Sequence, residues 1–250
     1  MNFENKRVLI TGGARGIGLE AAKSFLEQGA EVAIWALHKE SLDEAQEQLR
    51  KKIVGQSVDV GNYEAVQTAA NELRSSFGTI DVLVNNAGYT RTTPFLSEDK
   101  KYWERVMATN LWGVIYTTRA FLEDLIASEK GAIVNVISDA ARAGMAGEAV
   151  YAAAKGGVVS FSKSIAREVA KKGVRVNCVS PGPTRTRILE SNSEDGDAKK
   201  LIDKMIRMIP MRQIAEPKEI ADTIVYFASD AASHVTGQVL SVSGGLTMND

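Results

Sequence analysis

The feature that most constrains the fold is an alternation of short apolar runs with amphipathic segments along the whole chain. The runs RVLIT, EVAIWA and GAIVNVIS are rich in β-branched residues, which is typical of strands. Segments such as GLEAAKSFLEQG repeat apolar residues at helical spacing and end in glycine. The longest such segments predict helices from about Glu98 to Ser128 and from Val150 to Ala170. Apolar strands separated by helices predict a doubly wound α/β fold with a parallel sheet of about seven strands and helices on both faces.

Composition limits the number of domains and the kinds of partner. A chain of 250 residues with 44% hydrophobic and 24% charged residues suits a single domain spanning residues 1–250. The net charge of -1 leaves no basic excess for nucleic acid. One cysteine, Cys178, and two histidines, His38 and His234, offer neither an internal disulfide nor a metal cluster. The charged start MNFENKRVLI has no signal h-region or membrane span, so we expect a cytoplasmic protein.

A glycine-rich turn, TGGARGIG, joins the first predicted strand to the first helix. Gly12, Gly16 and Gly18 let the backbone pass close to a pyrophosphate seated on the first amides of the helix, where the dipole is positive. The spacing is G-x-x-x-G-x-G rather than G-x-G-x-x-G. A flexible strand-to-helix turn is therefore the alternative interpretation.

Polar residues also end three later strands. Asp59 follows the third strand, and its carboxylate suits an adenine amino group while the Val60 amide donates to the ring. The sequence NNAG ends the fourth strand, and Ser138 ends the fifth. Each alone reads equally well as a helix cap or a turn former. In a doubly wound sheet, however, ligands bind outside the carboxyl ends of the strands, which is where all of these residues are expected.

Tyr151 and Lys155 lie four residues apart in YAAAKGG and therefore share one helix face. A neighbouring ammonium favours the phenolate, so we expect it to lower the pKa of the phenol. Tyr151 would then exchange a proton with a carbonyl or alcohol oxygen, and Ser138 would hydrogen-bond the same oxygen. The alternative is an ordinary amphipathic helix with a half-buried tyrosine and a lysine whose stem lies along apolar surface.

Taken together, several motifs resemble the classical short-chain dehydrogenases/reductases from end to end and in order. They are TGGARGIG, NNAG, the asparagine of MATNLWG, Ser138 ahead of YAAAK, and PGPTRT followed by a terminal SGG. SDAARAGMAGEAVYAAAKGG and TGQVLSVSGGLTMND further resemble the group that contains 2-hydroxycyclohexanecarboxyl-CoA dehydrogenase, with 3-oxoacyl-thioester reductases as wider relatives. The resemblance implies a Rossmann-like domain and an NAD(P)(H)-dependent oxidoreductase that interconverts a ketone and a secondary alcohol. The ketone would be cyclic or acyl-type and apolar.

The resemblance also implies residue roles. Ser138, Tyr151, Lys155 and Asn110 would be catalytic, with Lys155 on the nicotinamide ribose and a water near Asn110 returning the proton that Tyr151 gives up. The residues expected to bind the cofactor are Gly12, Arg15, Gly16, Ile17, Gly18, Ala36, Leu37, His38, Asp59, Val60, Asn86, Ala87, Gly88, Tyr151, Lys155, Pro181, Gly182, Thr184 and Thr186. The residues expected to contact the substrate are Ser138, Met145, Glu148, Tyr151 and Met205.

The end of the second strand departs from the pattern of NAD users, which carry an aspartate there. This chain has Ala36, followed by Leu37. Ala36 removes the charge that would repel a 2′-phosphate, and Arg15, His38 or Lys39 could bind one. We therefore favour NADP(H) over NAD(H). The alternative is that Arg15 and His38 are ordinary solvated surface residues.

Three further expectations concern the lid, the assembly and the competing functions. The segment at about 184–212 is interpreted as a mobile substrate lid. The resemblance implies a homotetramer built through two long helices and the last strand. The competing functions are a polyol or sugar dehydrogenase, and a nucleotide-sensing binding protein without turnover.

Overall fold

The computed structural model describes residues 1–50, 53–128, 130–186 and 197–248, with the backbone alone for 197–201. Seven strands form one parallel sheet in the order β3-β2-β1-β4-β5-β6-β7, which confirms the predicted doubly wound fold. The strands are β1 (Arg7–Thr11), β2 (Glu31–Ala36), β3 (Val54–Ser57), β4 (Val82–Asn85), β5 (Ala132–Val136), β6 (Arg175–Pro181) and β7 (Val239–Val242).

The sheet is buried because its strands carry apolar residues on both faces. In β1, Val8 and Ile10 belong to the core cluster on one face, while Leu9 belongs to the cluster on the other. All three side chains are fully buried. Strands of this kind fit only between two helical layers.

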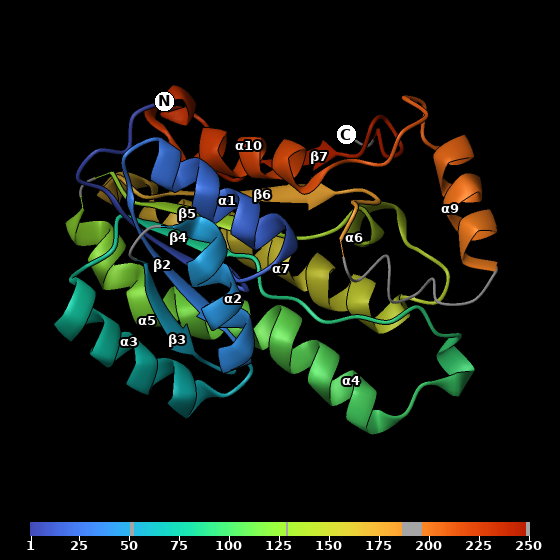
Figure 1. Ribbon diagram of the computed structural model, residues 1–250, viewed down its shortest axis with the longest axis horizontal. Coiled ribbons are helices and arrows are strands. Elements are labelled where there is room, and N and C mark those ends of the chain that lie inside the picture. The colour runs from blue at the N-terminus through green and yellow to red at the C-terminus, as the bar shows by residue number, and fades with distance from the viewer. Residues whose placement is uncertain (51–52, 129, 187–196, 249–250) are drawn as a thin grey trace.

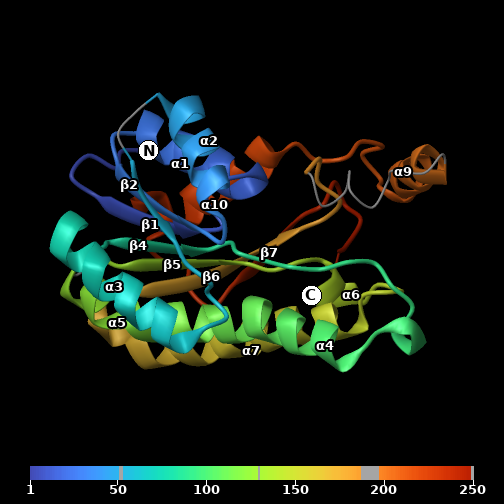
Figure 2. The same ribbon diagram turned by 60° about the horizontal axis from the view of Figure 1, so that its bottom comes forward.

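Helices cover both faces of the sheet. Figures 1 and 2 show α1, α2 and α10 on one face, and α3, α5 and α7 on the other, with α4 beside α7. The α-helices are α1 (Gly16–Glu27), α2 (Lys39–Leu49), α3 (Tyr63–Phe77), α4 (Lys100–Met107), α5 (Gly113–Ala127), α6 (Ala140–Ala143), α7 (Ala149–Val169), α9 (Asp197–Met208) and α10 (Pro217–Ala228). Short 3-10 turns lie at Phe95–Ser97, Ala170–Lys172 and Asp230–Ala232.

The long helix predicted from about Glu98 to Ser128 is confirmed, because helical backbone runs without a break from Lys100 to Ala127. The helix begins at Lys100, after Asp99 accepts a hydrogen bond from the amide of Tyr102, and a π-helical turn at Ala108–Trp112 separates α4 from α5. A π-helical turn inserts one extra residue into the helix and often occurs at functional sites. Here it contains Asn110, which is fully buried.

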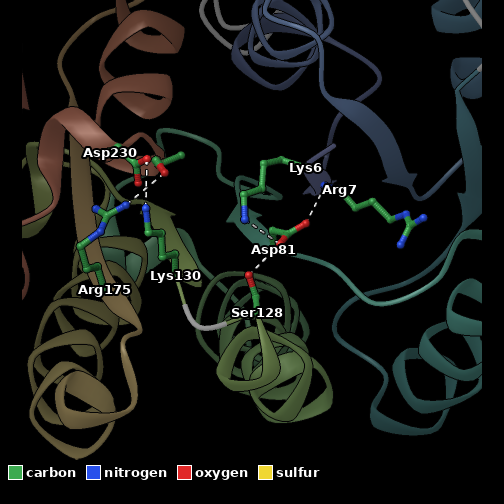
Figure 3. A network of polar contacts seen from close by, with 8 residues as sticks. Lys6, Arg7, Asp81, Ser128, Lys130, Arg175 and Asp230 are labelled. Atoms are coloured by element: carbon green, nitrogen blue, oxygen red, sulfur yellow. Dashed lines mark hydrogen bonds and ion pairs between the residues drawn. The ribbon is translucent and has the colours of Figure 1, made fainter. Parts of the chain in front are cut away.

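At the amino ends of the strands, Asp81 joins three elements. It lies just before β4, and its carboxylate accepts from the Lys6 ammonium at 3.0 Å, the Arg7 amide at 2.9 Å and the Ser128 hydroxyl at 2.6 Å, as Figure 3 shows. Burial acts to raise the pKa of Asp81, but these hydrogen bonds outweigh it and hold that pKa below its usual value. Asp81 therefore stabilises the edge of the sheet opposite the site.

The strand order reverses between β1 and β4, because β2 and β3 lie on one side of β1 and β4 to β7 lie on the other. Ligands of doubly wound sheets bind at this switch point, beyond the carboxyl ends of the strands. In Figure 1 the arrow of β6 points toward this end of the sheet, where α6 and α9 lie. The loops that leave β1, β4, β5 and β6 at this end carry the candidate site.

Candidate active site

The glycine-rich turn after β1 is shaped by close backbone approach. Gly12 has a φ of +63°, which favours glycine. A Cβ built on Gly18 would lie 2.3 Å from the Gly12 carbonyl oxygen, so no side chain fits there. Arg15 precedes α1 in an extended conformation and starts the helix without a side-chain cap. This narrow turn, which has glycines at its closest contacts and no side-chain cap on the helix that follows, fits the pyrophosphate of a dinucleotide.

Asn86 holds the turn in place. Its side-chain amide donates to the carbonyl oxygens of Thr11 at 3.1 Å and Gly12 at 3.0 Å. The Thr11 hydroxyl in turn accepts from the amides of Asn86 and Ala87, each at 3.1 Å. Thr11 was not among the residues predicted from the sequence, although its place at the end of β1 was a signal that could have found it. The first and fourth strands thus fix the site together.

The end of β2 carries no charge. Ala36 is buried, Leu37 is exposed, and His38 precedes α2 without capping it. Arg15 instead faces Glu44 of α2, with its Nη2 atom 3.3 Å from a carboxylate oxygen. Both side chains are about half exposed, so this ion pair is weak. The Arg15 guanidinium therefore lies beside α2, the helix that follows β2.

The structure places Asp59 at the exposed end of the third strand. Its carboxylate accepts from the Gly61 amide at 2.9 Å, and Val60 is buried. The alternative interpretation of Asp59 as a helix cap is wrong, because Asn62 caps α3 by accepting from the Ala65 amide. The role of Asp59 toward adenine stays a prediction.

Ser138 and Tyr151 form a hydrogen-bonded pair, which brings the end of β5 and the first turn of α7 together. Burial raises the pKa of Tyr151, the negative charge of Glu148 adds to the rise, and the hydrogen bond with Ser138 opposes it. The expectation that Lys155 lowers the pKa of this phenol is wrong for this structure, because burial dominates. The phenol is therefore held in its protonated form.

Lys155 is buried and points back toward the sheet. Its ammonium donates to the Val136 carbonyl at 2.8 Å and lies 5.9 Å from the centre of the Tyr151 ring. Burial lowers the pKa of Lys155 to about 8. An ammonium with this pKa changes charge near neutral pH.

Asn110 lies beside Lys155. A Cβ built on Gly88 would be 3.2 Å from the Asn110 Oδ1 atom and 3.8 Å from the Lys155 ammonium, so both groups lie on the side of Gly88 where a side chain would stand. The Asn110 amide donates to the carbonyls of Tyr89 at 2.7 Å and Val106 at 2.9 Å, while its oxygen accepts from the Tyr89 amide at 3.2 Å. Asn110 is fully buried.

The loop after β6 covers the other side of the turn. Gly182 packs so tightly that its Cβ would lie 2.7 Å from that of Ser243, and it follows Pro181, the last residue of β6. The Thr184 hydroxyl donates to the Gly182 carbonyl at 2.9 Å. The Thr186 side chain lies 3.3 Å from a Cβ built on Gly16, so this loop and the glycine-rich turn are in contact. Ile17 is half-buried in the first turn of α1.

The predicted substrate residues lie in two places, around the start of α7 and on α9. Met145 is 40% exposed in the loop before α7, whereas Glu148 is half-buried and bonded to the Thr92 hydroxyl. Met205 is half-buried on α9. Residues 187–196 of the predicted lid lie outside the described residues. Thr92 was not predicted from the sequence, and nothing in the loop YTRTTP marks it.

Two properties of the described part of the chain bear on other functions. None of its helices combines the length and the apolar character that a membrane span needs. Nor do these residues bring three or more His, Cys, Asp or Glu side chains together in a group able to hold a metal ion.

The fold and the paired phenol and ammonium at its switch point define a dinucleotide-dependent oxidoreductase of the α/β class. A family model described as enoyl-(acyl carrier protein) reductase matches residues 12–247. The 3-oxoacyl-(acyl-carrier-protein) reductase of Chlamydia trachomatis is 37% identical over 97% of both chains. The 3alpha-hydroxysteroid dehydrogenase of Mediterraneibacter gnavus is 34% identical over 98% of both chains.

A solved structure agrees with these relatives. A short-chain dehydrogenase/reductase from Brucella melitensis, named as a glucose/ribitol dehydrogenase, covers all of both chains with a TM-score of 0.92 and 33% identity. The chain belongs to the short-chain dehydrogenase/reductase family, within its 3-oxoacyl-thioester reductase group. It is an NAD(P)-dependent oxidoreductase that interconverts a ketone and a secondary alcohol.

Proposed function

We propose that the protein is an NADP(H)-dependent reductase of a cyclic or acyl-type apolar ketone. The observation that carries the proposal is the arrangement in which Ser138 bonds to Tyr151 while Lys155 and Asn110 both lie against Gly88. The relatives named for 3-oxoacyl groups and for hydroxysteroids support an acyl-type or ring ketone.

In this proposal each catalytic side chain has a defined role. Ser138 donates a hydrogen bond to the ketone oxygen, and Tyr151 transfers its phenolic proton to that oxygen. Lys155 and the Asn110 region return a proton to Tyr151, and Lys155 also binds the nicotinamide ribose. The bound dinucleotide supplies the hydride. The raised pKa of Tyr151 supports reduction, because the phenol stays protonated until the ketone oxygen accepts its proton.

The choice of NADP(H) rests on the end of β2. Ala36 has a small side chain and no negative charge that would repel a 2′-phosphate, and the Arg15 guanidinium lies beside α2. A 2′-phosphate would compete with Glu44 for Arg15, and a bidentate bond to phosphate is stronger than a half-exposed ion pair. Asp59 and Val60 would contact adenine, and Asn86, Ala87 and Gly88 the adjoining ribose. Thr184 and Thr186 would hold the carboxamide.

The remaining expectations concern assembly and location. We infer a homotetramer, with the exposed Trp112 beside α5 and the exposed Leu240 of β7 among the surfaces that copies would cover. We also infer a cytoplasmic protein that binds a small-molecule ketone or alcohol. The segment at about 184–212 would act as its substrate lid.

A polyol or sugar dehydrogenase is the second candidate, because the Brucella melitensis protein of the same fold is named as a glucose/ribitol dehydrogenase. A nucleotide-sensing protein without turnover is less well supported, because the whole catalytic set is present.

Cofactor absorbance with NADPH and NADH and a panel of cyclic, acyl and polyol substrates separates these functions. We expect a higher kcat/KM with NADPH and a cyclic or acyl ketone than with NADH or a polyol, and a loss of about 10²- to 10⁴-fold in Tyr151→Phe. Tyr116→Phe, on α5 away from the site, is the control and should be unchanged. Consumption unaffected by Tyr151→Phe would reject the proposed mechanism. Cofactor binding without consumption of any substrate would favour the sensor.

A further inference from the structure

Glu148 and Tyr151 occupy one turn at the start of α7. Glu148 is the N-cap residue of the helix and Tyr151 its third residue, and the Glu148 carbonyl accepts from the Ala152 amide at 2.7 Å. The negative charge of Glu148 adds to the rise in the pKa of Tyr151 that burial causes. The Glu148 side chain is half-buried.

The Glu148 side chain is held by the loop that follows β4. The Thr92 hydroxyl donates to its carboxylate, and the Thr93 amide donates to the Gly147 carbonyl at 2.9 Å. Gly147 permits this contact, since it has a φ of +81° and a Cβ on it would lie 2.9 Å from the Thr92 methyl group. The two loops thus fix the position of the carboxylate.

Most of the hydrogen-bonding capacity of Glu148 is open to a ligand. The side chain does not cap α7. In residues 1–50, 53–128, 130–186 and 202–248, whose side chains the structure describes, no lysine or arginine forms an ion pair with it. A carboxylate has about four lone-pair sites, and Thr92 fills one of them. Burial raises the pKa of Glu148, and the Thr92 bond opposes that rise. A half-buried acceptor beside the reacting group is suited to a donor on the substrate.

We propose that Glu148 selects ketones that carry a hydroxyl group on the carbon next to the carbonyl. This inference rests on the proposed function, in which Ser138 and Tyr151 hold the ketone oxygen. The side chains of the N-cap residue and of the third helical residue lie close enough to interact, so the two oxygens of an α-hydroxyketone can each hydrogen-bond one of them. The Glu148 carboxylate accepts from the hydroxyl and repels a carboxylate or phosphate at the same position.

Matched substrates isolate this contact. 2-Hydroxycyclohexanone can donate to Glu148, whereas 2-methoxycyclohexanone has a similar shape and cannot. The measurement is the ratio of kcat/KM for the two ketones in the wild type, in Glu148→Leu and in Thr92→Val. We expect the wild type to favour the hydroxyketone about tenfold or more, because a hydrogen bond to a charged group is stronger than a neutral one. Glu148→Leu should reduce that ratio to about one.

The variant Thr92→Val tests whether the Glu148 carboxylate selects the substrate or only holds the two loops together. It removes the bond between the loops but keeps the carboxylate, so it should lower both kcat/KM values together and leave their ratio within about threefold of the wild type. An equal ratio in wild type and Glu148→Leu would overturn the inference. If both ketones are nevertheless consumed and Tyr151→Phe abolishes that consumption, the proposed function stands. Failure of the wild type to reduce either ketone would count against both proposals.

Discussion

The Lys155 ammonium donates a hydrogen bond to the Val136 carbonyl at 2.8 Å, and this bond ties the second turn of α7 to the end of β5. Lys155 is 2% exposed, and its buried surroundings lower its pKa to about 8. The proposed proton relay therefore contains a group that titrates in an accessible pH range.

We predict that ketone reduction falls as the pH rises through about 8. Below that pH Lys155 is charged and able to return a proton, and above it the amine is neutral. In Lys155→Arg this descending limb should move to higher pH, since a guanidinium stays charged. Profiles of kcat/KM against pH test this, with Lys163→Arg on the exposed face of α7 as the control. A limb that stays in place in Lys155→Arg would show that another group titrates.

Asn86→Ala should weaken dinucleotide binding. The variant loses both bonds to the carbonyls of Thr11 and Gly12, so the glycine-rich turn is no longer fixed. Each lost bond is worth about 1 kcal/mol, and we expect the dissociation constant to rise about fivefold or more. Titration of NADPH by protein fluorescence measures it. Asn62→Ala removes the α3 cap and should cost about 1 kcal/mol of stability without changing that constant. Equal affinities in the two variants would argue against a role for Asn86.

Gly18→Ala should disrupt the cofactor site through one methyl group. Its Cβ would meet the Gly12 carbonyl oxygen at 2.3 Å, and the backbone must move to relieve that clash. We expect a loss of about tenfold or more in NADPH affinity, by the same titration. Gly156→Ala is the matched control, because its nearest neighbour is 3.9 Å away, and alanine there should stabilise α7 by up to about 1 kcal/mol. Unchanged affinity in Gly18→Ala would mean that the turn does not hold the pyrophosphate.

Asp81→Asn should destabilise the fold more than it affects activity. The folded state holds the pKa of Asp81 below its unfolded value, so its contribution is fully present above that unfolded value and is lost as the pH falls through the folded one. We expect a loss of about 1–3 kcal/mol at neutral pH, measured by urea unfolding, and a smaller loss near pH ~3. Asp222→Asn breaks an exposed pair with Lys218 and should cost much less stability, because solvent screens that pair. Equal losses in both variants would contradict the role of Asp81.

The sequence predicted those parts of the fold that depend on period and turn chemistry. The alternation along the chain was enough for the parallel sheet, and β1, β5 and α7 begin and end within about two residues of their predicted limits. The site residues were found because they follow strands, and their motifs matched a known family.

What the sequence did not reveal depends on contacts between distant segments. The π-helical turn has no periodic signal, and the bond between Thr92 and Glu148 joins two loops that are far apart in the chain. The pKa of Tyr151 was predicted in the wrong direction because the spacing to Lys155 is visible in the sequence, whereas burial is not. Local patterns therefore locate such groups without fixing their electrostatics.

The inserted residue at Ala108–Trp112 also sets the angular phase of everything that follows it in α5. Each residue advances an α-helix by about 100°, so deleting one residue from this turn would rotate Thr117 out of line with Asn85, to which its hydroxyl now donates at 2.7 Å. The same deletion would turn Asn110 away from Lys155. The extra residue thus sets the rotation of the helix on both sides of the π-helical turn. It lets Asn110 lie beside Lys155 while Thr117 of α5 contacts Asn85 of β4.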